Sequence, residues 1–257
     1  MIGWDKDGGP VKTFLAHLDD LRRLLLGCLV AWAVGMAVAA HEAPRIMKVL
    51  VLPLEKAGRS PADFLQTFEV MGGMNLAMTI AIWGGLLLAL PIMVGLIGNF
   101  ILPALTIRER RTVLAGGGLA VILFVMGASI AYFGMLTPAL RVMLWFNEWM
   151  GIRVEFFRVT DYVRFVLIMM AAFGICFELP VVLLGLGRLG IITSDQLRRS
   201  RRVAVVVLLI VAMIVTPTTD PFSQLVLAVP LVLLYEACIW AIWLMERRRR
   251  EEGLKGS

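Results

Sequence analysis

The sequence predicts an all-α integral membrane protein with several spanning helices. Of its 257 residues, 60% are hydrophobic, and the mean hydropathy is +0.85. Apolar runs near or above the ~18 residues that mark a spanning helix recur along the chain. Short basic or proline-containing segments separate these runs. The pattern is not that of a soluble domain, and residues 1–10 lack the apolar core of a cleavable signal peptide.

Six apolar segments follow one another along a single membrane domain, residues 1–245. The fifth has only 13 residues, which extend about 20 Å as a helix, against a hydrocarbon core of about 30 Å. Residues 14–25 have the pattern of an amphipathic helix at the membrane surface, and the charged tail, 246–257, is expected to fray. The predicted spans cover about 24–40, 74–97, 113–136, 165–187, 203–215 and 222–245.

Basic residues favour one face of this predicted bundle. The amino end, the turns at 99–112 and 188–202 and the tail hold 17 of the 25 Lys and Arg residues. The connections on the other face, 41–73, 137–164 and 216–221, hold the remaining 8. Cytoplasmic loops of membrane proteins carry an excess of Lys and Arg. The count therefore predicts that both termini are cytoplasmic.

Residue patterns typical of enzyme or metal chemistry are missing from the sequence. The two histidines, His17 and His41, are far apart, and all three cysteines fall in apolar segments. The sequence has no phosphate-binding glycine loop and no nucleophile elbow. We therefore expect no enzyme activity, no metal, no cofactor and no nucleic-acid partner.

Glu178 is the only charged residue between Arg164 and Arg188. A carboxylate at membrane depth costs roughly 2.5–3.5 kcal/mol on insertion scales, so it needs a partner, a water-filled cavity or a proton. Pro180 removes a backbone hydrogen bond and displaces the carbonyl of Cys176, which predicts an interrupted helix. Glu178 is then either a neutral acid bonded to a neighbouring helix or a functional group.

Two acids lie close to predicted spans on the basic face: Asp20 in HLDDLRR and Glu109 in RERR. Charged turns of this kind are usually solvated and of little energetic consequence. Alternatively, the two carboxylates form a site for a guanidinium ligand, because arginine binds carboxylates through its planar fork. This face carries a net charge of +8 and would repel a cation unless local acids faced it.

A polar cluster lies between the last two predicted spans, on the opposite face. Asp220 as a helix cap and Pro221 at the first helical position explain part of it. Gln224, nearly one turn into an apolar helix, can form a hydrogen bond to another helix. The short span beside it should thin the bilayer or recruit a partner helix. The cluster comprises Thr216, Thr218, Thr219, Asp220, Ser223 and Gln224.

Four motifs occur in order between about residues 14 and 244. They are FLAHLDDLR with His17 and Arg22; FILP from Phe100, followed by Glu109-Arg110-Arg111; FGICFELP with Glu178; and DPFSQ from Asp220, followed by Pro230 and Glu236. Together they resemble the TatC family, the multispanning receptor of the twin-arginine protein translocase. Asp20 stands where the family usually has glutamate, so the carboxylate reaches one methylene less far.

The resemblance implies a cupped fold with six spans, both termini inside and two short final spans. It implies a receptor and scaffold in a bacterial or archaeal cytoplasmic membrane that binds twin-arginine signal peptides of folded cargo. Partners would be TatA-like and TatB-like single-span proteins, further TatC copies and membrane lipids, with export driven by the proton-motive force.

The resemblance also assigns roles to individual residues. Glu178 would face the concave inner wall, and Asp220 would belong to the outer-face turn. Met213, Thr216 and Gln224 would dock a partner helix. The implied signal-peptide site comprises His17, Asp20, Arg22, Phe100, Glu109 and Arg111.

The alternative function is a proton-coupled small-solute transporter, with Glu178 as the carrier acid. The sequence has no long-period repeat and no matching pair of interrupted helices, which many transporters have. Further intramembrane charges that would form a proton relay are also missing. These observations favour the receptor over the transporter.

Overall fold

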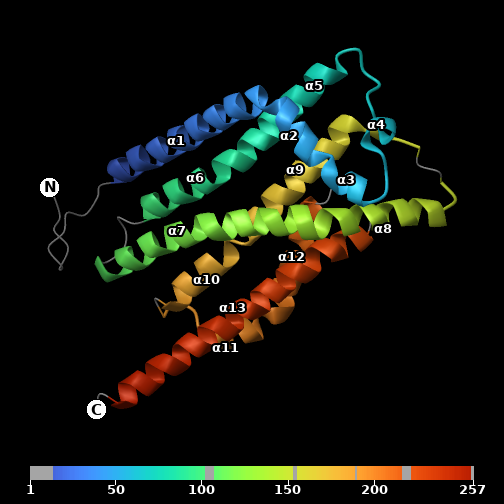
Figure 1. Ribbon diagram of the computed structural model, residues 1–257. Coiled ribbons are helices and arrows are strands. Elements are labelled where there is room, and N and C mark those ends of the chain that lie inside the picture. The colour runs from blue at the N-terminus through green and yellow to red at the C-terminus, as the bar shows by residue number, and fades with distance from the viewer. Residues whose placement is uncertain (1–13, 102–106, 153–154, 189, 216–220, 256–257) are drawn as a thin grey trace.

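The computed structural model describes residues 14–101, 107–152, 155–188, 190–215 and 221–255. Its long helices run beside one another, and short elements gather at one end of the bundle (Figure 1). The start of α1 and the end of α13 lie toward the other end. The described elements are α1 (Phe14–His41), α2 (Ala43–Leu50), α3 (Leu52–Lys56), α4 (Pro61–Phe64), β1 (Leu65–Gln66), α5 (Gly72–Thr79), the π-helical η1 (Ile80–Gly84), α6 (Gly85–Ile101), α7 (Ile107–Ile130), the π-helical η3 (Ala131–Met135), α8 (Leu136–Trp149), β2 (Phe157–Arg158), α9 (Val159–Cys176), α10 (Leu179–Arg188), α11 (Ser194–Arg199), α12 (Arg201–Val215) and α13 (Pro221–Lys255).

Among the residues that the structure describes, five stretches are long and apolar enough to cross a membrane. They are Leu18–His41, Gly72–Gly98, Gly118–Trp149, Val159–Arg188 and Ala228–Arg248. Each overlaps a predicted span. The fifth predicted span corresponds to α12, whose 15 residues extend about 22 Å. It is shorter than the hydrocarbon core, as its sequence suggested.

Two helices continue beyond the spans that the sequence predicts. The third predicted span ends at residue 136, but the chain remains helical through η3 and α8 to Trp149. Leu136, Ala139, Leu140 and Leu144 are buried, and this helical spacing places them on one face against the core. The sequence predicts that residues 137–149 belong to a connection between spans, and this prediction is wrong because they form a helix.

The expectation that the charged tail frays is wrong for residues 246–255. α13 is one helix of 35 residues that ends at Lys255. The helix that contains the last predicted span is therefore long, whereas the resemblance implied two short final spans. Two contacts support the extension. Glu246 binds Ser194 at the start of α11, and Arg247 pairs with Glu251 four residues later at 3.0 Å.

The short helices α2, α3 and α4, together with β1 and β2, form a cap over one end of the bundle. Four side chains from η3, α8 and α9 donate hydrogen bonds to carbonyls of α2 and α3. Such bonds satisfy carbonyls that short helices leave open at their ends. The pairs are Tyr132 with Val49 O (2.6 Å), Tyr162 with Leu50 O (2.8 Å), Thr137 with Pro53 O (3.5 Å) and Arg141 with Lys56 O (2.7 Å).

Glycines allow α7 and α9 to approach closely in the middle of the bundle. A Cβ on Gly127 would lie 2.7 Å from the Phe173 carbonyl, and one on Gly174 would lie 2.5 Å from the Phe124 ring. Small residues at such crossings are typical of membrane helices, where close backbone packing replaces the hydrophobic effect as the source of association. This contact positions the end of α9, where Glu178 follows.

Candidate functional site

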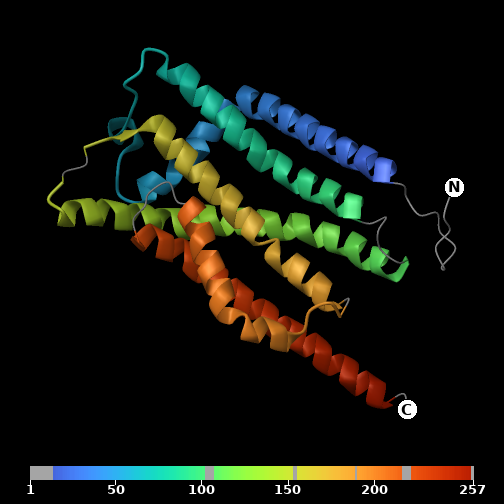
Figure 2. The same cartoon turned by 180° about the vertical axis from the view of Figure 1, so that it is seen from behind.

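The residues of the predicted signal-peptide site belong to three helix ends. Asp20 and Arg22 lie in the second and third turns of α1, Phe100 lies in the last turn of α6, and Glu109 and Arg111 lie in the first two turns of α7. Figures 1 and 2 show the start of α1, the end of α6 and the start of α7 at the same end of the bundle, away from the cap. The fold therefore brings these segments to one end.

The described side chains of this group differ in exposure. Asp20 and Phe100 are half-buried, whereas Arg22 is exposed. The side chains of His17, Glu109 and Arg111 lie outside the described residues, although their backbone is helical.

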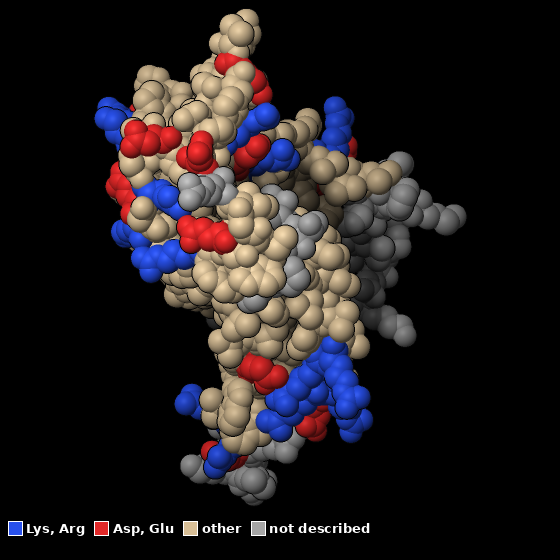
Figure 3. Space-filling view, turned by 90° about the vertical axis from the view of Figure 1, so that its right-hand side faces the viewer, with Lys and Arg blue, Asp and Glu red and all other residues tan. Residues whose placement is uncertain are grey.

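Charges differ between the two ends of the bundle. At the cap, Lys and Arg are interspersed with Asp and Glu (Figure 3), and ion pairs join Arg45 to Glu42 at 2.7 Å and Arg59 to Glu148 at 3.1 Å. Away from the cap, α11 and the start of α12 present exposed arginines with one exposed acid, Asp195. These arginines are Arg198, Arg199, Arg201 and Arg202.

Glu178 lies in the break between α9 and α10. The helix interruption that Pro180 predicts is confirmed: α9 ends at Cys176 and α10 begins at Leu179. The side chain of Glu178 is buried, with 9% of the residue surface exposed. Within the described part of the chain, its Oε1 atom has no hydrogen-bond partner. A buried polar atom without a partner is costly, so this carboxyl is a candidate for contact with a group outside the chain.

The polar site between α12 and α13 is described in part. Gln224 Nε2 donates a hydrogen bond to the Leu209 carbonyl of α12 at 3.0 Å, so the amide joins the two helices. Met213 is 53% exposed near the end of α12. Thr216 and Asp220 lie outside the described residues. Exposed side chains at helical spacing continue the Met213 face: Val203, Val206, Val207, Ile210 and Ile214.

Three interactions of the α11–α13 region were not predicted from the sequence. Ser194 donates from its backbone N and its Oγ to the Glu246 carboxylate, at 2.9 and 2.6 Å. Arg201 pairs with Glu236 at 2.8 Å, and Tyr235 donates to the Leu197 carbonyl at 2.9 Å. Each pair is 35 or more residues apart in sequence, so local patterns carry no signal for it.

The described residues contain no group of three or more His, Cys, Asp or Glu that could hold a metal ion. What the chain offers is a basic end with acids at helix starts, a buried carboxyl in a helix break, and a short helix with an exposed apolar face. These are features of recognition surfaces.

Comparison with known proteins agrees with this interpretation. A family model described as "Sec-independent protein translocase protein (TatC)" matches residues 16–230. TatC of Aquifex aeolicus is 32% identical over 235 residues, covering 91% of this chain and 96% of the relative. TatC of Deinococcus radiodurans is 33% identical over 225 residues, covering 86% and 82%. A chloroplast relative from Arabidopsis thaliana is 32% identical over 240 residues, covering 91% and 67%.

A solved structure of the "Twin Arginine Translocase Receptor- TatC" has the same fold. It matches with a TM-score of 0.77 at 32% identity, covering 89% of this chain and 98% of the other. The family match, the identities over nearly the whole length and the shared fold all agree. The chain is therefore a multi-pass membrane protein of the TatC family, the receptor component of the twin-arginine translocase.

Proposed function

We propose that this translocase component binds the twin-arginine signal peptides of folded cargo on its basic end. Asp20 and Glu109 would accept the arginine guanidinium groups, with His17, Arg22, Phe100 and Arg111 completing the site. A guanidinium binds a carboxylate with two parallel hydrogen bonds, which a lysine cannot match. The acids thus supply both attraction and discrimination on a face that otherwise repels cations.

One observation carries this proposal. The start of α1 and the start of α7, which hold Asp20 and Glu109, lie at the same end of the bundle although 89 residues separate the two acids (Figure 1). Two acids brought to one end of a basic surface form a natural site for a pair of cations.

We further propose that the chain is one membrane domain with six crossings in a cupped bundle. In a bacterial cytoplasmic membrane, the distribution of basic residues would place both termini in the cytoplasm. The basic end then faces newly made cargo, and the cap faces the far side. In addition to the five long stretches, α12 would form a further crossing, the fifth in chain order. Because α12 is short, it would thin the bilayer around it.

The same short helix is the proposed docking site for TatA-like and TatB-like single-span partners. Its exposed face of Val, Ile and Met residues ends near Met213, beside Gln224. Thr216 and Asp220 would extend this polar region. An apolar face with one polar group at its end suits a partner helix that carries its own polar residue.

Peptide binding to the purified full-length protein tests the proposed site. A signal peptide with Arg-Arg and its Lys-Lys version are titrated against the parent protein, Asp20→Asn and Glu109→Gln. We expect the parent to prefer Arg-Arg, and each variant to lose roughly 1.5–3 kcal/mol of binding free energy, the range for a charge-assisted hydrogen bond.

Asp195→Asn is the matched control, because Asp195 is an exposed acid on α11 near the same basic end. It should bind as the parent does. Asp20→Glu, which restores the glutamate usual in the family, should bind at least as tightly as the parent. Equal binding of Arg-Arg and Lys-Lys peptides by the parent and both acid variants would reject the site.

A further inference from the structure

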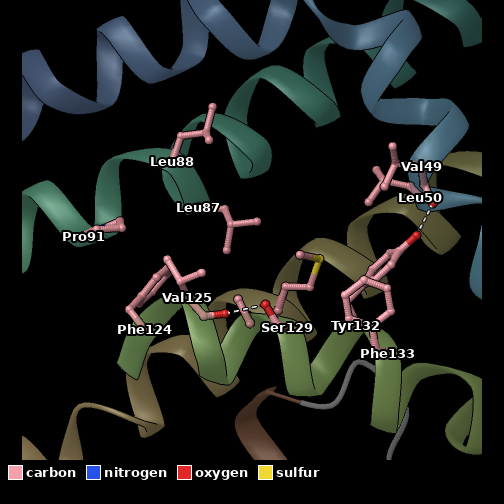
Figure 4. Close-up of a pocket in the computed structure, with 12 residues that line it drawn as sticks. Val49, Leu50, Leu87, Leu88, Pro91, Phe124, Val125, Ser129, Tyr132 and Phe133 are labelled. Carbon is pink, nitrogen blue, oxygen red and sulfur yellow. Dashed lines mark hydrogen bonds between the residues drawn. The ribbon is translucent and has the colours of Figure 1, made fainter. Parts of the chain in front are cut away.

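An apolar cavity of about 370 Å³ lies between α6 and α7, beside the end of α2 (Figure 4). Its size is at the lower end of the roughly 300–1,000 Å³ of small-molecule sites. The two hydroxyls in its wall are engaged within the chain: Ser129 donates to the Val125 carbonyl at 2.7 Å, and Tyr132 to Val49. The cavity therefore offers almost no free polar group. The wall includes Leu87 and Pro91 of α6, Phe124 and Phe133 of α7 and η3, and Met170 of α9.

The cavity follows the direction of the helices. Phe124 and Phe133 both line it, and they are nine positions apart on one continuous helical rod, which corresponds to about 14 Å along the axis. On the facing helix, Pro91 interrupts the hydrogen bonding of α6. α2 closes the cap end through Val49 and Leu50. A chain-like apolar ligand would thus lie parallel to the membrane-spanning helices.

Two cations lie at the cap end of this cavity. The Lys56 ammonium is 5.8 Å from the centre of the Phe133 ring, and Phe133 lines the cavity. Arg141, about two turns further along the rod, donates to the Lys56 carbonyl at 2.7 Å. Both side chains are exposed.

These two cations have no acid partner in the described part of the chain. In the described part of the chain, neither Lys56 nor Arg141 forms an ion pair, whereas Arg45 and Arg59 at the same end do. Glu55, although adjacent to Lys56, pairs with neither. Two uncompensated cations at one end of an apolar cavity complement a ligand with an anionic head and an apolar chain.

We propose that the cavity holds one acyl chain of an anionic glycerophospholipid whose phosphate is bound by Lys56 and Arg141. The head would lie at the cap, level with the membrane surface, and the chain would run between α6 and α7. A peptide segment in extended conformation fits less well, because its backbone amides would find no free polar partner in the wall. An acyl chain has no such groups to satisfy.

Native mass spectrometry of the full-length protein, released from a non-ionic detergent, tests this site. Phosphatidylglycerol and phosphatidylcholine with identical acyl chains are added separately. We expect one phosphatidylglycerol to be retained more strongly than phosphatidylcholine. Lys56→Gln and Arg141→Gln should each weaken phosphatidylglycerol retention roughly fivefold and phosphatidylcholine retention much less, because the choline cation already offsets the charge of that phosphate.

Two further variants test the cavity itself. Ser129→Trp and Leu88→Trp fill it from opposite helices, and each should lose retention of both lipids. Arg202→Gln removes an exposed cation from the other end of the molecule and should bind lipid as the parent does.

Four results would overturn the proposal. The first is equal retention of the two lipids by the parent, and the second is parental retention in both filled variants. The third is a loss in Arg202→Gln that equals the loss in Lys56→Gln. The fourth is that a photoreactive side chain at position 88, in membranes containing phosphatidylglycerol, crosslinks to an added signal peptide and not to lipid.

Discussion

Glu178 and Glu246 are both carboxyl groups of long apolar helical segments, yet their surroundings differ. Glu246 accepts two hydrogen bonds from Ser194, of which only 3% is exposed, and so fastens α13 to the start of α11. Glu178 is more deeply buried than the half-buried Glu246, but its Oε1 atom has no partner in the described part of the chain. The difference suggests that Glu246 maintains the fold, whereas Glu178 is kept for a contact that the chain itself does not make.

The largest effect on stability is expected from Glu246→Ala. The substitution leaves the backbone N and the hydroxyl of buried Ser194 without acceptors, which should lower the free energy of unfolding by roughly 3 kcal/mol. Thermal unfolding in detergent measures the change. Glu246→Gln keeps one acceptor oxygen and should lose about half as much.

Arg201→Gln is the control for this loss. It breaks an ion pair with Glu236 that is partly exposed at both side chains, and such pairs contribute at most about 1 kcal/mol. If Glu246→Ala were no more destabilising than Arg201→Gln, the structural role assigned to Glu246 would be wrong.

Gln224→Leu should have an intermediate effect, on partner association more than on folding. It removes the hydrogen bond to the Leu209 carbonyl and the polar group beside the exposed face of α12. Interhelical polar contacts contribute about 0.5–2 kcal/mol in membranes. Disulfide crosslinking between a cysteine at position 213 and the partner helix should fall, while signal-peptide binding stays at the parental level. Unchanged crosslinking would make Gln224 a purely internal link between α12 and α13.

Glu178→Ala should have the smallest effect on stability. Removing an unpartnered polar atom offsets the small cavity that the substitution leaves, so the free energy of unfolding should change by less than about 1 kcal/mol. Export of a folded twin-arginine reporter should nevertheless fall, because alanine cannot donate a hydrogen bond to an inserted peptide or partner. Glu178→Gln can donate one and should retain most of the export activity.

The two Glu178 variants also separate the receptor from the transporter. Glutamine cannot release a proton, so a proton-carrying role requires that both variants fail alike. Equal and complete loss of export at matched expression would contradict the donor role and support proton coupling through Glu178.

Much of the fold could be predicted because a membrane-spanning helix is recognised from the apolar residues of its own segment. Apolar length located the spanning helices, and Pro180 located the break beside Glu178. The continuation of the third helix through α8 was missed, although the spacing of Leu136, Ala139 and Leu140 was available as a signal. The general rule that charged ends fray was misleading for α13, because a tertiary contact of Glu246 supports that end.

The contacts that join distant segments were beyond sequence reasoning. Tyr132 and Val49 are 83 residues apart, and Ser194 and Glu246 are 52 apart. The carbonyl to which each tyrosine donates depends on how the helices pack. Helix packing cannot be inferred from a single sequence. The apolar cavity between α6 and α7 is likewise a product of packing, since most of its lining residues are ordinary apolar side chains. Among the predicted peptide-site residues, Asp20 and Glu109 could be selected as acids next to predicted spans on the basic face. The other site residues followed only from the resemblance to the TatC family.

The most direct test of the receptor function is a double-mutant cycle between the acids and the peptide arginines. Affinities are measured for the parent, Asp20→Asn and Glu109→Gln with peptides in which the first, the second or neither arginine is replaced by glutamine. We expect each acid to couple with one arginine by roughly 1.5–3 kcal/mol and much less with the other. Coupling energies near zero for all four acid–arginine pairs would contradict the assignment of Asp20 and Glu109 as the groups that recognise the twin arginines.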